Sequence, residues 1–98
     1  MVVKVIIQRT FKEGNYKEAA NMLIRARQNA MQHDGYISSE TLSNCDNPND
    51  IVVLSMWESR KDWWRYKDSQ ARKDLEREFE SLMEGGTRTT AYDMGMKR

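Results

Sequence analysis

Residues 2–11 of the chain, VVKVIIQRTF, carry the pattern that indicates the fold most directly. The segment is rich in β-branched residues and contains no glycine or proline, which is typical of a strand. Apolar side chains occur at both parities, with Val3, Val5, Ile7 and Phe11 on one face and Val2 and Ile6 on the other. A strand with one face in water would alternate apolar and polar residues. We therefore expect this strand to be covered on both faces.

Residues 51–57, IVVLSMW, show the same pattern. Because the run is almost continuously apolar, it predicts a second central strand that is covered on both sides. Residues 36–43, YISSETLS, predict a weaker and more polar strand, and residues 44–50 have the composition of a turn. The last strand is expected over residues 88–95.

An amphipathic helix is predicted between the first two strands. Asn15 with Glu18 three residues later fits a helix N-cap, and apolar residues then recur at spacings of three and four to about Gln32. The helix is expected to stop at Asp34-Gly35, because glycine adopts the left-handed conformation that ends many helices.

Two more helices are predicted between the third and fourth strands. Ser59 followed by Asp62 marks the start of a short helix that reaches about Asp68. Ser69 is expected to cap a further helix that extends to about Met83. The order is therefore β-α-β-β-α-β with the second helix split in two.

That order predicts an α+β fold of the ferredoxin-like type, with an antiparallel sheet and the helices on one face. The 98 residues are sufficient for one domain, which we expect to span 1–98 with an ordered core at about 2–95. Lys97 and Arg98 are expected to form a frayed end.

The helices can cover only one face of such a sheet. The other face is expected to expose part of Val3, Val5 and Ile7, together with alternate residues of 51–57. Monomers rarely leave an apolar patch of that size in water. The simplest cover is the same face of a second copy related by a two-fold axis. We therefore predict a homodimer through the helix-free sheet face, which is a dimeric α+β barrel.

The composition argues against several classes of partner. The 16 basic and 15 acidic residues give a net charge of +1, which provides no field to attract nucleic acid. No apolar run approaches the ~20 residues of a membrane span, and the N-terminus lacks a signal-peptide layout, so we expect a cytoplasmic protein. One histidine and one cysteine exclude the usual zinc ligand sets, so no metal site is expected.

Several motifs are similar to those of the antibiotic biosynthesis monooxygenase family. They are Asp34-Gly35-Tyr36, Met56-Trp57-Glu58-Ser59, Trp63-Trp64-Arg65-Tyr66 and Ser69. The resemblance covers nearly the whole chain, and it implies dimers of ferredoxin-like subunits with a pocket between sheet and helices. Some members oxidise polyketide-like phenols or quinols with oxygen and no metal or flavin, and others degrade haem.

The haem-degrading branch can be compared position by position. Its strand asparagine, short-helix tryptophan and long-helix histidine ligand align with Gln8, Tyr66 and Glu76. Glu76 replaces the imidazole that would hold the iron. Haem degradation is therefore the less favoured of the two family activities. We expect no cofactor.

The resemblance thus implies a cofactor-independent monooxygenase acting on a small aromatic, phenolic or quinol-like compound. Gln8 is a candidate for donating a hydrogen bond to a substrate oxyanion, and Tyr66 is a candidate for hydrogen bonding to a substrate oxygen. Trp63 is a candidate for forming a wall of the pocket, and Glu76 is a further candidate for lining it. For each of these side chains, core packing or surface exposure is the alternative interpretation.

No convincing base emerges from the sequence. His33 has the only side chain whose ordinary pKa suits a base near neutrality, but it lies at a predicted helix C-terminus, where a capping role is favoured. The alternative hypothesis is therefore a non-catalytic homodimer that binds a small ligand. An RNA-binding module of the same element order is disfavoured, because residues 51–57 lack the required basic-glycine-aromatic run.

Overall fold

The computed structural model describes residues 1–96, and the frayed end predicted at Lys97 and Arg98 lies outside them. The elements are β1 (Val3–Thr10), α1 (Tyr16–Met31), β2 (Tyr36–Ser43), β3 (Asp50–Trp57), α2 (Arg60–Lys67), α3 (Gln70–Glu78), the 3-10 turn η1 (Glu80–Leu82) and β4 (Arg88–Asp93). The predicted β-α-β-β-α-β order with a split second helix is confirmed.

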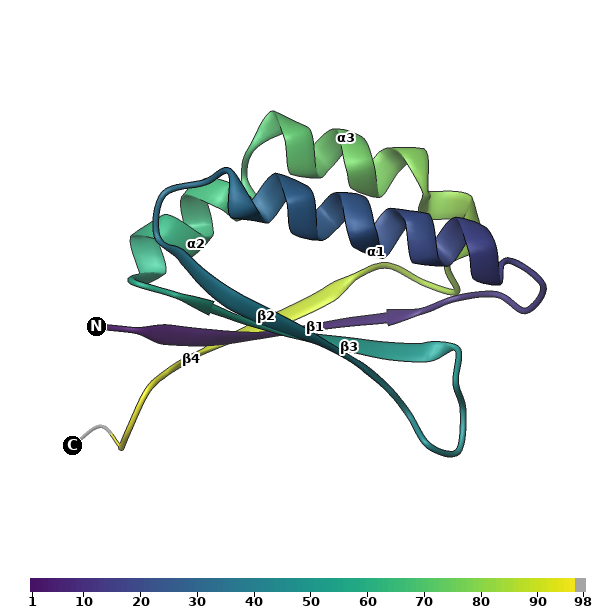
Figure 1. Ribbon diagram of the computed structural model, residues 1–98, viewed down its shortest axis with the longest axis horizontal. Coiled ribbons are helices and arrows are strands. Elements are labelled where there is room, and N and C mark those ends of the chain that lie inside the picture. Colours follow the sequence, from purple (N-terminus) through teal and green to yellow (C-terminus); the bar gives the residue numbers. More distant parts are fainter. Residues whose placement is uncertain (97–98) are drawn as a thin grey trace.

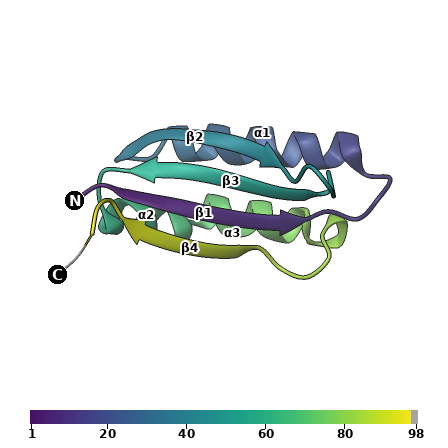
Figure 2. The same cartoon turned by 90° about the horizontal axis from the view of Figure 1, so that it is seen from below.

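The four strands form one antiparallel sheet in the order β2-β3-β1-β4. All helices lie on one side of this sheet (Figure 1). Seen from the opposite side, the strands are unobstructed, with α1 behind β2 and α3 behind β1 and β4 (Figure 2). The central strands are therefore β1 and β3, as their apolar composition indicated.

The structure corrects the expectation about which residues of β1 remain uncovered. Val3 and Val5 are completely buried and Ile7 is 6% exposed, because all three point toward the helices and pack with Ala30 of α1 and Trp63 of α2. Successive side chains of a strand point to opposite faces. The helix-free face of β1 therefore carries the intervening residues.

The helix-free face nevertheless has a substantial apolar content. Ile6 pairs with Leu54 across β1 and β3, and both are only partly buried. The neighbouring apolar residues on this face are Val52, Met56, Leu42 and Tyr92. Leu42 and Tyr92 are about half exposed, at 44% and 54%. Within residues 1–96, no segment of the chain covers this face (Figure 2).

The helix starts follow the predicted caps in two of three cases. The Ser59 hydroxyl oxygen accepts a hydrogen bond from the backbone N–H of Asp62 at 3.1 Å, and Ser69 accepts from the N–H of Arg72 at 3.3 Å. Asn15 occupies the N-cap position of α1 but its side chain makes no capping bond. Its amide instead donates to the carbonyl of Glu13 at 3.4 Å.

The long helix ends earlier than predicted, at Glu78 rather than near Met83. The cause is tertiary pairing at the far end of β1. The N–H of Lys12 donates to the carbonyl of Leu82, and the N–H of Glu84 donates to the carbonyl of Thr10. An α-helix continued to Met83 would remove the extended conformation that Met83 adopts in its bridge to Phe11.

The core between sheet and helices consists of two hydrophobic clusters. One contains Val3, Val5, Ile7, Ala30, Trp57, Trp63 and Tyr66, and the other contains Phe11, Ala19, Met22, Ile51, Leu75 and Met83. Along β1, the buried face passes from Ile7 in the first cluster to Phe11 in the second. The residue between them on that face is Arg9, which is only 4% exposed. A charged group therefore lies between the two halves of the core.

Candidate functional site

Arg9 is part of a buried polar cluster that joins β1 to α3. Its Nη2 lies 3.2 Å from Oε1 of Glu76, and Nη2 of Arg72 lies 3.7 Å from the same oxygen. Residues four apart on a helix share a face, which places Arg72 and Glu76 together opposite the strand. We call these residues the Arg9–Glu76–Arg72 cluster.

The hydrogen-bonding capacity of this cluster is only partly used. Nε of Arg9 and Oε2 of Glu76 are buried without a hydrogen-bond partner within residues 1–96. Leaving a buried polar atom unpaired costs about 1–3 kcal/mol, and more for a charged group. A ligand that supplies both a donor and an acceptor would therefore gain from binding here.

Aromatic side chains surround the cluster on the α2 side. The guanidinium carbon of Arg72 lies 5.6 Å from the ring centroid of Trp63, which is cation–π distance. Trp57 stacks on Tyr66 with ring centroids 5.1 Å apart, and Tyr66 donates its hydroxyl to the carbonyl of Ala26 at 3.3 Å. Arg72 is thus held between aromatic and acidic groups.

Burial changes the acidity of two of these groups. It raises the pKa of the Tyr66 phenol, and the charges of Arg72 and Arg9 oppose that shift. Tyr66 therefore remains a neutral donor at physiological pH. Burial lowers the pKa of Arg72, while the carboxylate of Glu76 raises it and Arg9 lowers it further. Because the ordinary pKa of an arginine side chain lies far above neutrality, Arg72 stays positively charged at neutral pH.

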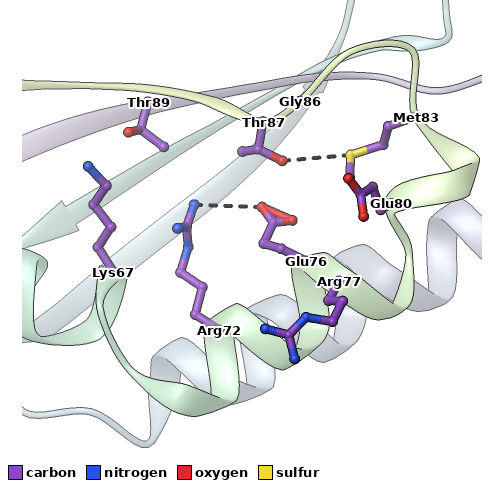
Figure 3. A pocket seen from close by; sticks show the side chains of 9 residues that line it. All are labelled: Lys67, Arg72, Glu76, Arg77, Glu80, Met83, Gly86, Thr87 and Thr89. Carbon is purple, nitrogen blue, oxygen red and sulfur yellow. Dashed lines mark hydrogen bonds and ion pairs between the residues drawn. The ribbon is translucent and has the colours of Figure 1, made fainter.

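A cleft of about 440 Å³ opens beside this cluster, between α3 and β4 (Figure 3). Its lining residues are Lys67, Arg72, Glu76, Arg77, Glu80, Met83, Gly86, Thr87 and Thr89. In Figure 3, Arg72 and Glu76 rise from α3 toward Thr87 and Thr89 on the opposite wall. This volume lies within the range of about 300–1,000 Å³ that is usual for small-molecule sites. We call this space the α3–β4 cleft.

A much smaller cavity of about 30 Å³ lies on the other side of the cluster, between α1 and the sheet. Its lining includes Arg9, Ser55, Trp57 and Tyr66. Such a space accommodates about one or two water molecules. Arg9 lines this cavity and Glu76 lines the cleft, so their ion pair lies between the two spaces.

A third hollow, of about 250 Å³, lies at the start of α1 near Phe11 and Pro48. Lys12 is its one charged lining residue, and none of its lining residues takes part in the buried polar cluster. Because the cleft combines a volume of about 440 Å³ with the buried pair of Arg72 and Glu76, we assign the candidate active site to the cleft.

The family described as antibiotic biosynthesis monooxygenase matches residues 2–78 of the sequence. The chain belongs to this family. The fold of this family member closely resembles that of SnoaB, a cofactor-independent oxygenase from Streptomyces nogalater, with a TM-score of 0.83 at 14% identity, covering 98% of this chain and 95% of that one. Rv0793 from Mycobacterium tuberculosis gives a TM-score of 0.84 at 14% identity, with coverages of 99% and 98%.

A conserved protein from Methanosarcina mazei Go1 is similar to the same degree, with a TM-score of 0.84 at 15% identity and coverages of 94% and 91%. A search of curated protein sequences found no significant match. At identities this low the structural likenesses establish the fold of this family member.

The structure brings three of the five candidate residues to or near the cluster. Glu76 lines the cleft and Tyr66 lines the small cavity. The ring of Trp63 contacts the guanidinium of Arg72. Gln8 lies on the helix-free face, where it pairs with Val52 and Arg88. Gln8 therefore lies on the opposite side of the sheet from the cluster, since alternate residues of β1 point to opposite sides.

His33 lies at the C-terminal end of α1. Its Nδ1 is 2.9 Å from the carbonyl oxygen of Asn29, and because a carbonyl can only accept, this nitrogen donates. The imidazole also packs edge-on against Tyr66, with ring centroids 5.0 Å apart. It lines neither the cleft nor the small cavity. The structure therefore keeps His33 away from the cleft.

Sequence reasoning missed the two arginines. For Arg9 a signal was present, because it continues the parity of Val3, Val5 and Ile7 on the buried face of β1. A charge on the buried face of a central strand is unusual and indicates a partner or a function. For Arg72 there was no such signal in the sequence. Its neighbours on α3 are mostly exposed acidic and basic residues, and nothing in the pattern distinguishes it from them.

Among residues 1–96, no group of three or more histidine, cysteine or carboxylate side chains is arranged to hold a metal ion. No helix in this part of the chain is both long and apolar enough to cross a membrane.

Proposed function

We propose that this family member is a monooxygenase that oxidises a small aromatic, phenolic or quinol-like compound in the α3–β4 cleft. The observation that carries the proposal is the position of Arg72, a buried cation that lines the cleft while it rests on Trp63. Oxygenation without a cofactor requires a substrate that becomes an electron-rich anion. Buried cations placed beforehand stabilise such an anion.

The chemistry can balance without an external reductant. A ring methylene beside a phenol loses two hydrogens and gains one oxygen atom from O₂ to become a ketone, and a hydroquinone with a free ring C–H likewise becomes a hydroxyquinone. In both cases the second oxygen atom leaves as water. The protein must remove the first proton and stabilise the resulting anion. Arg72 serves the second role, and Glu76 serves the first, because its Oε2 has no hydrogen-bond partner within the described residues.

The first test is oxygen consumption with simple hydroquinones and anthrones. We expect turnover by the wild-type protein and a fall of at least about 100-fold in Glu76→Gln, which is the usual effect of removing a general base. Glu80→Gln is the matched control, because Glu80 is an exposed carboxylate at the same cleft. We expect Glu80→Gln to stay within a few-fold of wild type. Equal rates in wild type and Glu76→Gln would refute the role of Glu76.

A second candidate function is a non-catalytic protein that binds a small ligand. It is favoured by the absence of histidine from the cleft lining and by the engagement of Glu76 with two arginines. The two functions differ in one result. Saturable binding of a hydroquinone or anthrone without oxygen consumption by the wild-type protein would select the ligand-binding function.

We also propose that the chain forms a two-fold homodimer through the helix-free face. The support is the apolar content of that face, which includes Ile6, Leu54 and Met56 on the central strands. Two such faces packed together would exclude water from side chains that one subunit leaves partly exposed. Two sheets in this arrangement lie about 10 Å apart.

Leu54→Arg tests the dimer. Leu54 lies at the centre of β3 on the helix-free face, so arginine there would force a long charged side chain into the middle of the packed dimer interface. We expect wild type to sediment as a dimer and Leu54→Arg to sediment as a folded monomer of 11.6 kDa. Ile24→Arg is the control, because Ile24 is 56% exposed on α1. A wild-type monomer at micromolar concentration would overturn the proposal.

A further inference from the structure

Positive charge exceeds negative charge around the α3–β4 cleft. Lys67, Arg72 and Arg77 line it together with two carboxylates, Glu76 and Glu80. Arg9 adds a further buried cation behind Glu76. The single carboxylate of Glu76 is therefore shared between two buried guanidinium groups, and the cluster at the floor of the cleft has a net positive charge. A buried excess of one sign is unfavourable unless a ligand compensates it.

Arg72 is the cation placed to receive that ligand. It is 8% exposed, and its distance of 3.7 Å from Glu76 is too long for a hydrogen bond. Its side chain makes no hydrogen bond within residues 1–96. A guanidinium group carries five N–H donors in a planar fork that matches a carboxylate. These donors lie at the lining of the cleft and are unused.

The other walls supply neutral and positively charged groups. Thr87 and Thr89 lie across the cleft from α3, with the hydroxyl of Thr87 directed toward Met83, and Lys67 at the end of α2 lies near Thr89 (Figure 3). Thr87 makes one weak contact, donating to Sδ of Met83 at 3.6 Å. A ligand in the cleft would thus meet cations and hydroxyl donors on one part of its surface and the apolar side chain of Met83 on another.

We propose that the cleft recognises an aromatic carboxylate, with the carboxylate group bound by the guanidinium of Arg72. Arg9 has a supporting role, because its ion pair with Oε1 of Glu76 offsets part of the negative charge that Arg72 also faces. The inference rests on the proposed function in taking the cleft as the ligand site. It goes further in assigning a negative charge to the substrate before any proton is removed.

The test compares 2,5-dihydroxybenzoate with its methyl ester, which has the same ring and hydroxyls but no charge. Affinities are measured by calorimetry without oxygen, so that no turnover occurs. We expect wild type to bind the acid about tenfold or more tightly than the ester, as a charge-assisted hydrogen bond to one group implies. Equal affinities, or no binding of the acid at millimolar concentration, would overturn the inference.

Two substitutions should shift this preference in opposite directions. Arg72→Met is expected to abolish the preference for the acid, whereas Arg65→Met, an exposed arginine of α2, is expected to keep it. Glu76→Gln removes the competing carboxylate and is expected to bind the acid more tightly than wild type while turning it over more slowly. Should Arg72→Met fail to fold, the acid and ester affinities of wild type and Glu76→Gln decide the question.

The outcomes separate this inference from the proposed function. Tight binding of the acid without oxygen consumption would refute the monooxygenase and support the carboxylate site. Oxygen consumption with the ester and the acid at equal kcat/KM would refute the carboxylate site and support the monooxygenase.

Discussion

Replacing Trp57 with alanine is expected to lower the free energy of unfolding by about 3–5 kcal/mol. Trp57 is completely buried at the end of β3. Its ring contacts three other aromatic rings, those of Tyr36, Trp63 and Tyr66, at centroid distances of 5.6, 6.0 and 5.1 Å. Alanine would leave a cavity where these rings meet, because neighbours anchored on β2 and α2 can relax only in part.

The substitution also removes a polar partner. The indole nitrogen of Trp57 donates to the hydroxyl of Ser55 at 3.2 Å, and Ser55 is itself buried. Since domains of this kind have about 5–15 kcal/mol of total stability, the expected loss is a large part of the whole. The position of Arg72 should also become less well defined, because Trp57 packs against Trp63, whose ring contacts the guanidinium of Arg72.

The measurement is urea denaturation followed by circular dichroism, at one fixed protein concentration because association contributes to apparent stability. Trp64→Ala is the matched control. Trp64 lies on α2 but is 54% exposed, so the same chemical change should alter stability by less than about 0.5 kcal/mol. Similar losses in the two variants would contradict the assignment of Trp57 as the centre of the aromatic core.

Replacing Gly35 with alanine is the second large effect, with an expected loss of about 2–4 kcal/mol. Gly35 has a φ of +87°, which L side chains rarely adopt. A Cβ at this position would also run into the side chain of Asp62. Asp62 accepts the hydroxyl hydrogen of Ser59 at 2.8 Å, so displacing it would disturb the start of α2.

Gly14→Ala separates the two causes. Gly14 has the same φ of +87°, but nothing lies within 4 Å of the position that its Cβ would take. This control should therefore show only the backbone strain, about 1–2 kcal/mol. Thermal or urea unfolding of both variants measures the difference. Equal losses at the two positions would show that the contact between Gly35 and Asp62 has no effect on stability.

The elements and their order could be predicted because local interactions determine them. The strand over Tyr36–Ser43 and the caps at Ser59 and Ser69 agree with the prediction. In each case the deciding contacts, such as the bond from Asp62 to Ser59, join residues close together in the chain. Motifs of the same local kind, around Gly35 and Trp57, indicated the family.

The site was predictable only in part. Glu76 was a candidate, but its partner Arg9 is 67 positions away in the chain, and no local pattern relates the two. Gln8 and Arg9 are neighbours in sequence, and the pleat of the strand alone places one on the helix-free face and the other in the core. Which of them would face the helices depended on how α1 and α3 packed.

The types of element, their order and the family follow from local patterns in the sequence, because alternation in strands and the helical repeat are properties of a few consecutive residues. The tertiary structure decided which face of β1 is covered, where α3 ends and which charges meet beside the cleft. Both faces of β1 carry apolar side chains, so their pattern could not select the covered one. That choice, and with it the burial of Arg9 against Glu76, was made by the packing of segments distant in the chain.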